Sequence, residues 1–362
     1  MIRSPRALQT ERGSIPLPAF VPDATRGTVR AVPTHLLQEV GTEVLMCNAL
    51  HLSEKPGSAT IKGLGGLGSF MGWEGPIMTD SGGFQVWSLA RDRGGLGTVT
   101  DKGFVLGDGK GRTRKFGPQR AMTAQLRLGA DIVFTLDQCT HPDDPPDVQD
   151  DSVRRTLAWA RTCRDLVDRH RGKRPLLYAV IQGGREMDRR RRCVDGLLEI
   201  GFDGYGFGGV PFDEHGALEE AVGQVAELLP PDVHRHALGI GRPNSVLAAW
   251  RAGWRTFDAV SPTREARRGL VYVPTVDPTD PVAVGAAERV SAYLDLTDDQ
   301  LWRDPRPIEE GCECPACRRY SRAYLSHLLR TEDAAGATLA TLHNLAFLQR
   351  MVRTLRAYEA AA

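Results

Sequence analysis

The sequence predicts an α/β fold, namely a (β/α)8 barrel of the TIM type followed by a helical C-terminal subdomain. Two observations predict the barrel. Eight short apolar runs lie in the first 270 of the 362 residues, and each ends near a Gly, Asp, Asn or Gln residue. Amphipathic stretches separate several of these runs, as expected for alternating strands and helices. An open doubly wound sheet is the competing architecture, but the count of eight favours a closed barrel.

The candidate strands, in chain order, are Ala19–Pro22, Glu43–Asn48, Pro76–Thr79, Ile132–Asp137, Leu176–Gln182, Gly204–Gly208, His236–Gly241 and Thr256–Val260. Apolar residues at three- and four-residue spacing predict helices between them, for example at Asp151–Arg169 and His215–Leu229. In a barrel of this type the active site lies where the strands end and the following loops begin. The polar residues at these ends are therefore the candidates for function.

The alternation of strands and helices stops near residue 270. The stretch Val273–Asp304 is rich in Pro, Asp and Ala and predicts a partly helical insertion, whereas Arg319–Glu359 predicts a long helical stretch. We therefore expect two domains. Residues 1–270 form the catalytic barrel, and residues 271–362 form the insertion and a helical subdomain that packs on the barrel.

The composition excludes several classes of protein. With 46 Lys and Arg against 45 Asp and Glu, the chain is neither a polybasic tail nor an acidic disordered segment. No apolar run reaches the roughly 20 residues that a membrane-spanning helix needs, and no secretory segment is recognisable. Seven cysteines, an odd number in a long chain, argue against a disulfide framework. We expect a cytoplasmic protein without a membrane partner.

A cysteine cluster near the C-terminus predicts a metal site. Cys312, Cys314 and Cys317 lie within six residues, and His343 follows them. Three thiolates and one imidazole complete a closed tetrahedral shell for Zn²⁺, which is the arrangement of structural zinc sites. A chance cluster of thiols is the alternative, and it is less consistent with this spacing. His327 on the same helical stretch is a second candidate for the fourth ligand.

Two acidic residues at strand ends are candidates for catalysis. Asp80 precedes Ser81-Gly82-Gly83, and Asp258 lies at the end of the last candidate strand. Two carboxylates that face one pocket suit chemistry at an anomeric carbon, because one can form a glycosyl ester while the other moves protons. Each has a structural alternative, since an Asp at a strand end also caps helices or pairs with an arginine such as Arg264.

A second pair of strand ends suits recognition of a base. The carboxylate of Asp137 accepts hydrogen bonds from a ring N–H and an exocyclic amine, and the amide of Gln182 both donates and accepts. Gly208-Gly209 adds a backbone N–H donor. A polar network at the mouth of the barrel is the alternative. The neighbouring Cys139 is interpreted as a small core residue, because no strong base adjoins it.

Arginines are clustered although the total charge is balanced. The run Arg189–Arg192 is interpreted as the solvated face of a helix. Arg264, Arg267 and Arg268 differ, because they directly follow Asp258. Guanidinium groups at this position can hold phosphates on both sides of a reacting nucleotide.

These features together resemble the tRNA-guanine transglycosylases, also called queuine tRNA-ribosyltransferases. The resemblance runs in the same order from about Ala7 to Met351. The pieces that carry it, which are highly specific taken together, are Pro18–Pro22, Gly27–Val29, Thr79–Gln85, Asp137–Thr140, Ile181–Gly184, Phe257–Arg264, the cysteine cluster and His343-Asn344. The resemblance implies a zinc-bearing barrel that exchanges guanine in a tRNA anticodon loop for a 7-deazaguanine base, such as 7-aminomethyl-7-deazaguanine. It also implies a homodimer.

Residue by residue, the resemblance implies that Asp258 is the nucleophile at the ribose C1′ and that Asp80 is the general acid and base. Further implied roles are base recognition by Asp137, Gln182 and Gly209, with Phe84 and Leu238 lining the base. A U-G-U anticodon loop would be bound by Arg264 and Arg267. The implied zinc ligands are Cys312, Cys314, Cys317 and His343.

Where bacterial members usually carry Gly-Gly-Leu-(Ala or Ser)-Val-Gly-Glu, this chain has Gly208–Glu214, with Val210, Pro211 and Phe212 in the middle. This segment and the long insertion after Gly269 keep two alternatives open. In the first alternative, the same reaction acts on DNA or on a free nucleoside. In the second alternative, the chain is a non-catalytic partner subunit. Retention of both Asp80 and Asp258 argues against the second. A conventional glycoside hydrolase does not explain the cysteine cluster.

Overall fold

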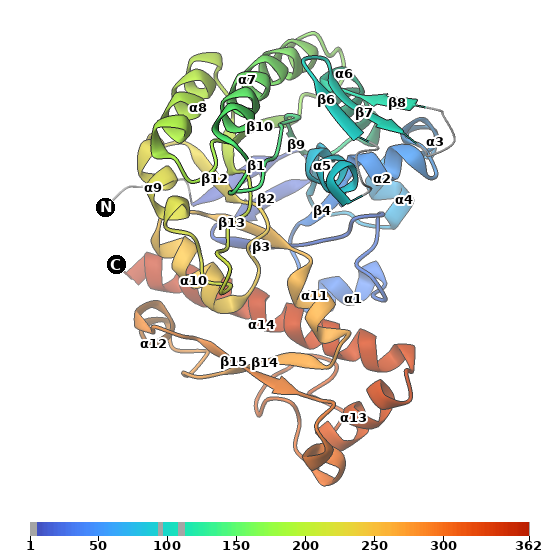
Figure 1. Cartoon of the computed structure of the whole chain (residues 1–362). Helices are drawn as coiled ribbons and strands as arrows, with labels where there is room; N and C mark the ends of the chain where they lie inside the picture. Colours follow the sequence, from blue (N-terminus) through green and yellow to red (C-terminus); the bar gives the residue numbers. More distant parts are fainter. Residues whose placement is uncertain (1–5, 93–96, 108–112, 362) are drawn as a thin grey trace.

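The structure is a computed structural model that describes residues 6–92, 97–107 and 113–361. Eight parallel strands form one sheet in the order β3-β13-β12-β11-β10-β9-β5-β4. Their bounds are β3 Ala19–Pro22, β4 Leu45–Asn48, β5 Ile77–Asp80, β9 Ile132–Phe134, β10 Leu176–Ile181, β11 Gly204–Phe207, β12 His234–Ala237 and β13 Thr256–Ala259. A parallel bridge between Asp23 and Met46 brings the edge strands β3 and β4 together. The predicted (β/α)8 barrel is thereby confirmed (Figure 1).

Helices surround the barrel because its strands alternate between an inward and an outward face. Ala19, Val21 and Met46 pack inside the barrel, where Leu8 and Ile15 of the N-terminal hairpin join the same cluster. Phe20 and Leu45 point outward into the main core against the helices. The helices up to the last barrel strand are α1 Thr34–Glu39, α2 Ala49–Glu54, α3 Ser58–Gly63, α4 Leu67–Met71, α5 Gly83–Asp92, α6 Pro118–Leu128, α7 Pro146–Asp168, α8 Met187–Ile200, α9 Glu220–Leu228 and α10 Pro243–Arg251.

Two small antiparallel sheets were not predicted. The first is the hairpin β1 (Ala7–Thr10) and β2 (Gly13–Pro16). The second has three strands, which are β6 (Gly97–Thr100), β7 (Gly103–Gly107) and β8 (Thr113–Phe116). Their strands are four or five residues long and carry exposed polar residues, so their periodicity is weak in the sequence.

The C-terminal region combines a strand pair with helices. After α11 (Ser261–Ala266), strands β14 (Leu270–Pro274) and β15 (Ser291–Asp295) pair antiparallel, with α12 (Pro281–Ala286) between them. A short 3-10 helix, η1 (Asp299–Arg303), precedes the cysteine cluster. The partly helical insertion predicted for this stretch therefore also contains strands. Figure 1 shows this strand pair beyond α14, on the side away from the barrel.

Several predicted boundaries shift for local reasons. The strand predicted at Ile132–Asp137 ends at Phe134, whose N–H and C=O both bond to the side chain of Gln125. The helix predicted at His215–Leu229 begins only at Glu220, because Asp213 accepts hydrogen bonds from the backbone of the preceding turn.

The long C-terminal helical stretch is two helices, α13 (Arg322–Arg330) and α14 (Ala334–Ala361). The chain breaks between them at Glu332, which has a positive φ of 54°. Helix α14 runs back along the barrel, where Gln349 donates a hydrogen bond to the carbonyl of Phe20 on β3. No helix in the described residues is long and apolar enough to cross a membrane.

Candidate active site

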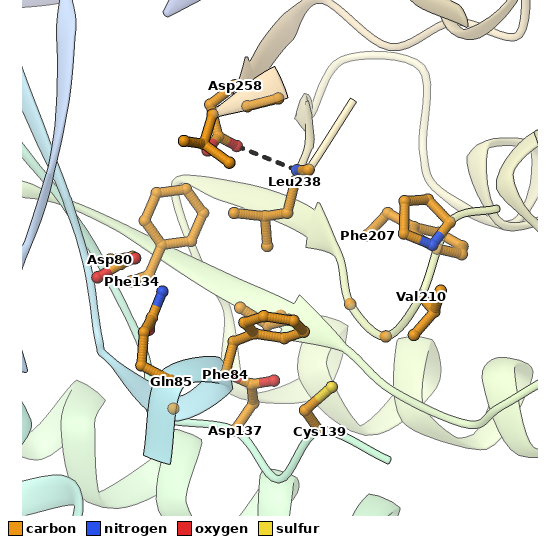
Figure 2. A pocket seen from close by; sticks show the side chains of 18 of the residues that line it. Asp80, Phe84, Gln85, Phe134, Asp137, Cys139, Phe207, Val210, Leu238 and Asp258 are labelled. Carbon is orange, nitrogen blue, oxygen red and sulfur yellow. Dashed lines mark hydrogen bonds between the residues drawn. The ribbon is translucent and has the colours of Figure 1, made fainter. Parts of the chain in front are cut away.

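A cavity of about 460 Å³ opens at the carboxyl ends of the barrel strands. Sequence-predicted residues that line it are Asp80, Phe84, Asp137, Gln182, Gly209, Leu238, Asp258 and Arg264. Figure 2 shows Asp258 and Asp137 on opposite sides of this cavity, with Phe84, Phe134 and Leu238 between them. Of the residues predicted to act on or bind the substrate, Arg267 alone does not line the cavity.

The order of the strands divides the mouth of the barrel into two arcs. The neighbouring strands β13, β3, β4 and β5 carry, at their ends, Asp258, Asp23, Asn48 and Asp80. We call these four residues the acidic arc. The other four neighbours, β9 to β12, lead into Asp137, Gln182, Gly209 and Leu238, which we call the base arc. Residues that are far apart in the sequence therefore face each other across one cavity.

Asp258 is held through one of its two carboxylate oxygens. Its Oδ1 lies 3.0 Å from Nε2 of the buried His236 and accepts a longer hydrogen bond of 3.4 Å from the N–H of Gly239. The hydroxyl of Thr256 lies 2.7 Å from the other ring nitrogen of His236. When this hydroxyl donates to Nδ1, Nε2 carries the proton and donates to Asp258. The second oxygen of Asp258 is then available to attack.

Asp80 is placed to carry a proton. Its Oδ2 accepts a hydrogen bond of 2.9 Å from the amide of Asn48, and its Oδ1 is buried without a partner in the described residues. Burial, followed by the nearby charge of Asp23, raises the pKa of Asp80 well above its usual value. The neutral carboxyl is therefore favoured, and it can act as an acid toward a leaving group.

On the base arc, Asp137 and Gln182 form a buried pair. The amide nitrogen of Gln182 donates to Asp137 Oδ2 over 2.6 Å, and Gln182 Oε1 has no partner among the described residues. Burial raises the pKa of Asp137 to about 6, so that the carboxylate form predominates at neutral pH. Gly209 has a positive φ of 92°, which brings backbone rather than a side chain to the cavity. These groups match the donors and acceptors of a purine-like edge.

Apolar side chains cover the space between the two arcs. Phe84 lines the cavity although half of its surface is exposed, so it is available to stack on a bound ring. Cys139 lines the cavity as well and is buried, as predicted for a core residue, and burial raises the pKa of its thiol. A neutral thiol is a poor nucleophile.

The arginines that follow Asp258 lie on and after α11. Arg264 is exposed at the rim of the cavity, and Arg268 is exposed beyond the helix. Arg267 is partly buried, and its Nη1 has no hydrogen-bond partner in the described residues. Burial and the charges of Arg30 and Arg264 lower the pKa of Arg267. An anion beside this group would relieve the repulsion.

The solvated face predicted for Arg189–Arg192 is wrong for Arg190. This side chain is 2 % exposed and donates hydrogen bonds to the carbonyls of Gly184, Ile181 and Gly208, over 2.7 to 3.0 Å. Its guanidinium also lies over the ring of Phe207. Burial lowers its pKa to about 10. Arg190 thus ties together the two loops that present Gln182 and Gly209.

We expect Arg190→Leu to lower the free energy of unfolding by about 3 kcal/mol, because two buried carbonyls and one part-buried carbonyl lose their donor. Urea denaturation followed by circular dichroism measures the change. Arg191→Leu is the matched control, because Arg191 is exposed on the same helix. It should change stability by less than about 0.5 kcal/mol. Equal stability of the two variants would contradict the role of Arg190.

The four predicted metal ligands meet in the C-terminal region. The Sγ atoms of Cys312, Cys314 and Cys317 and a ring nitrogen of His343 all lie within 4.8 Å of one another. His343 Nε2 lies 2.7 Å from the carbonyl of Tyr272 and so must donate to it, which leaves Nδ1 as the lone-pair nitrogen. Nδ1 lies 3.3 to 3.9 Å from the three sulfurs. The donor set and the tautomer fit a metal ion.

The surroundings of this cluster show which histidine belongs to it and how it is connected to α11. His327 is exposed on α13 and is not part of the cluster, so His343 is the fourth member. Asn344 accepts a hydrogen bond from the N–H of Tyr272 and donates to the carbonyls of Pro262 and Leu270. The metal-binding segment is thereby connected to α11, which carries Arg264.

Sequence reasoning missed three residues of the acidic arc and its support: Asp23, Asn48 and His236. Asp23 directly follows one predicted strand and Asn48 ends another. The rule that active-site residues lie at strand ends was therefore sufficient to find both. His236 stood at the start of a predicted strand and carried no such signal. The strand begins two residues earlier, at His234, and His236 points toward Asp258 from the neighbouring strand.

Comparisons with known proteins show the family of this chain. The family model described as queuine tRNA-ribosyltransferase matches residues 6–358. The queuine tRNA-ribosyltransferase of Gloeobacter violaceus is 38% identical over 350 residues, which is 96% of this chain and 87% of that protein. Those of Psychrobacter sp. and Ruegeria pomeroyi are 36% and 35% identical, over 95% and 96% of this chain and 86% and 88% of their own lengths. The chain therefore belongs to the queuine tRNA-ribosyltransferase family.

Proposed function

We propose that this protein is a tRNA-guanine transglycosylase, a pentosyltransferase that exchanges guanine in a tRNA anticodon loop for a 7-deazaguanine base. The observation that carries the proposal is the pairing of the two arcs across one cavity. The acidic arc supplies Asp258 and Asp80 for chemistry at a sugar, and the base arc supplies a purine-like set of donors and acceptors. Membership of the family supports the same reaction.

The reaction proceeds through a covalent intermediate on Asp258. The free carboxylate oxygen attacks C1′ of the ribose, a glycosyl ester forms, and the C1′–N9 bond breaks. The electron pair of that bond leaves with guanine, which takes the proton of Asp80. The incoming base then returns a proton to Asp80 and attacks C1′, which releases Asp258. The ester retains the energy of the glycosidic bond, so that neither ATP nor a nicotinamide cofactor is needed.

The base arc recognises both the leaving and the incoming base. The carboxylate of Asp137 accepts from the ring N–H and the exocyclic amine, while Gln182 and the N–H of Gly209 serve the carbonyl edge. Phe84 and Leu238 enclose the ring. Exclusion of water by these apolar groups protects the ester from hydrolysis.

The anticodon loop is the proposed acceptor, and Arg264 and Arg267 are the proposed contacts to its phosphates. A base in a single-stranded loop leaves its stack at low cost. The incoming base has a 7-substituent that meets Val210, Pro211 and Phe212, which line the cavity. This apolar wall, which replaces the segment usual in bacterial members, motivates a test of the other acceptors as well.

The test is incorporation of radiolabelled guanine into three acceptors: bulk tRNA, duplex DNA and guanosine. Label in tRNA supports the proposal. Label only in DNA or only in guanosine rejects tRNA as the acceptor and supports the corresponding alternative. Absence of label from all three, with a correctly folded protein, supports a non-catalytic partner subunit.

We further propose that Cys312, Cys314, Cys317 and His343 hold a structural Zn²⁺. A closed shell of four protein ligands leaves no position for substrate, so the ion cross-links the region and takes no part in the exchange. Through Asn344 the same helix supports α11.

Cys317→Ala is expected to reduce the zinc content from about one ion per chain to nearly none, because a structural site needs all four ligands. The C-terminal region should then unfold at a lower temperature than in the wild type. Elemental analysis and thermal denaturation measure the two effects. Cys163→Ala is the control, because Cys163 is buried in α7 and belongs to a different core cluster from the metal ligands. A zinc content of one in Cys317→Ala would contradict the assignment.

Three expectations stay predictions. The sequence pattern and composition predict the division into domains 1–270 and 271–362 and the cytoplasmic location, and the resemblance implies the homodimer. Light scattering of the purified protein gives its molar mass in solution and thereby tests the homodimer directly.

A further inference from the structure

Asp23 is the third carboxylate of the acidic arc, and the proposed exchange does not use it. It directly follows β3 and bridges to Met46 of β4, so it lies between the strands that carry Asp258 and Asp80. It lines the cavity together with both of them. The register of β3 and β13 places Val21 opposite Asp258, two residues before Asp23.

The hydrogen bonds of Asp23 leave one oxygen for a ligand. In the part of the chain that the structure describes, the N–H of Thr25 donates to Oδ1 over 2.7 Å, and the hydroxyl of Thr25 donates to the same oxygen. Oδ2 receives no such bond. The side chain of the adjacent Asn48 already makes two hydrogen bonds, because its oxygen accepts from the N–H of His51 and its nitrogen donates to Asp80.

A nucleotide that reacts in this cavity must place C1′ of its ribose within reach of Asp258 and its base within reach of Asp80. The sugar then lies along the acidic arc, over the strand ends between these two residues. The carbon next to C1′ carries the 2′-hydroxyl in RNA and none in DNA. Carboxylates form strong, charge-assisted hydrogen bonds with hydroxyl groups, and such bonds to the 2-hydroxyl strengthen at an oxocarbenium-like transition state.

We propose that Asp23 Oδ2 accepts a hydrogen bond from the 2′-hydroxyl of the acceptor nucleotide and thereby selects ribose over deoxyribose. This inference rests on the proposed function. The burial of Asp23 beside Asp258 raises its pKa, and a bound hydroxyl compensates for part of the lost hydration.

The experiment compares two synthetic stem-loops with a U-G-U loop, identical except that one carries 2′-deoxyguanosine at the target position. Exchange of radiolabelled guanine gives kcat/KM for each. We expect the wild type to prefer the all-ribose loop by about 10- to 100-fold. In Asp23→Ala this preference should fall to within about threefold, mainly because kcat/KM for the all-ribose loop decreases. Asp23→Leu, which keeps a similar side-chain size but has no acceptor oxygen, covers the case in which the alanine variant fails to fold.

Asp147→Asn is the matched control, because Asp147 is an exposed carboxylate in the first turn of α7. It should keep the wild-type preference. An unchanged preference in both Asp23 variants, or a wild type that does not discriminate, would overturn the inference. If Asp23 acted only through the protonation of Asp80, its variants would shift the pH profile and leave the preference intact, which would overturn the inference too.

Failure of the proposed function is recognised separately. If the wild type labels only DNA, both proposals fail. If it labels no nucleic acid, the two fluorescently labelled stem-loops are titrated onto Asp258→Asn and onto the double variant with Asp23→Ala. If Asp258→Asn binds the all-ribose loop more tightly than the deoxy loop and the double variant does not, the contact of Asp23 is supported. If the two variants show the same preference, or neither shows one, the contact is rejected.

Discussion

Asp258→Asn is expected to lower guanine exchange by about four orders of magnitude, because an amide cannot form the glycosyl ester on which the exchange depends. The substitution keeps the shape of the side chain and an oxygen that accepts from His236, so the fold should be retained. Incorporation of radiolabelled guanine into tRNA measures the rate. A denaturing gel measures the covalent protein–RNA adduct, which should be present in the wild type and absent from the variant.

The surface variant Asp147→Asn serves as the control for the loss of one negative charge. It should form the adduct and exchange guanine at the wild-type rate. An adduct that persists in Asp258→Asn would show that another residue is the nucleophile. Asp23 and Asp80 would then be the next candidates, because they line the same cavity.

Asp80→Asn is expected to lower exchange by about 10²- to 10⁴-fold, the usual contribution of a general acid and base. The leaving guanine then departs without a proton from the enzyme. The pH profile gives a sharper test. Because burial and Asp23 raise the pKa of Asp80, its carboxyl stays protonated to a higher pH than usual. Wild-type activity should therefore decline as the pH rises through that raised pKa.

This alkaline decline should be absent from Asp80→Asn, whose amide does not titrate. The measurement is kcat/KM for guanine exchange as a function of pH in both proteins. Asn48→Ala is an informative companion, because it removes the hydrogen bond that lowers the pKa of Asp80. Its alkaline decline should move to a higher pH. An identical profile in the wild type and Asp80→Asn would exclude Asp80 as the titrating group.

The base arc and the metal cluster were predictable because their signals are local. Asp137 and Gln182 each end an apolar run, and a polar residue at such a place indicates an active-site loop in a barrel. The cysteines lie within six residues, so their spacing alone predicts a metal site. Even the choice between His327 and His343, however, needed the structure, since both lie on the same helical stretch.

Arg190 illustrates why other features were not predictable. Its neighbours Arg191 and Arg192 are exposed, and a run of four arginines is typical of a solvated face. The structure shows that this one guanidinium turns inward to three carbonyls of two loops. Those carbonyls come together only when β10 and β11 pair, and the sequence contains no local record of that pairing.

The sequence by itself determined the barrel, the three cysteine ligands and the strand-end residues of the cavity, because strand periodicity, ligand spacing and chain order are local properties. Tertiary structure alone decided that Asp258, Asp23, Asn48 and Asp80 stand side by side. The reason is physical: the last barrel strand, β13, pairs with the first, β3, and the bridge between Asp23 and Met46 makes β3 and β4 neighbours. Closure of the sheet thereby brings together strands from both ends of the barrel sequence, and with them the carboxylates that we propose to act on the sugar.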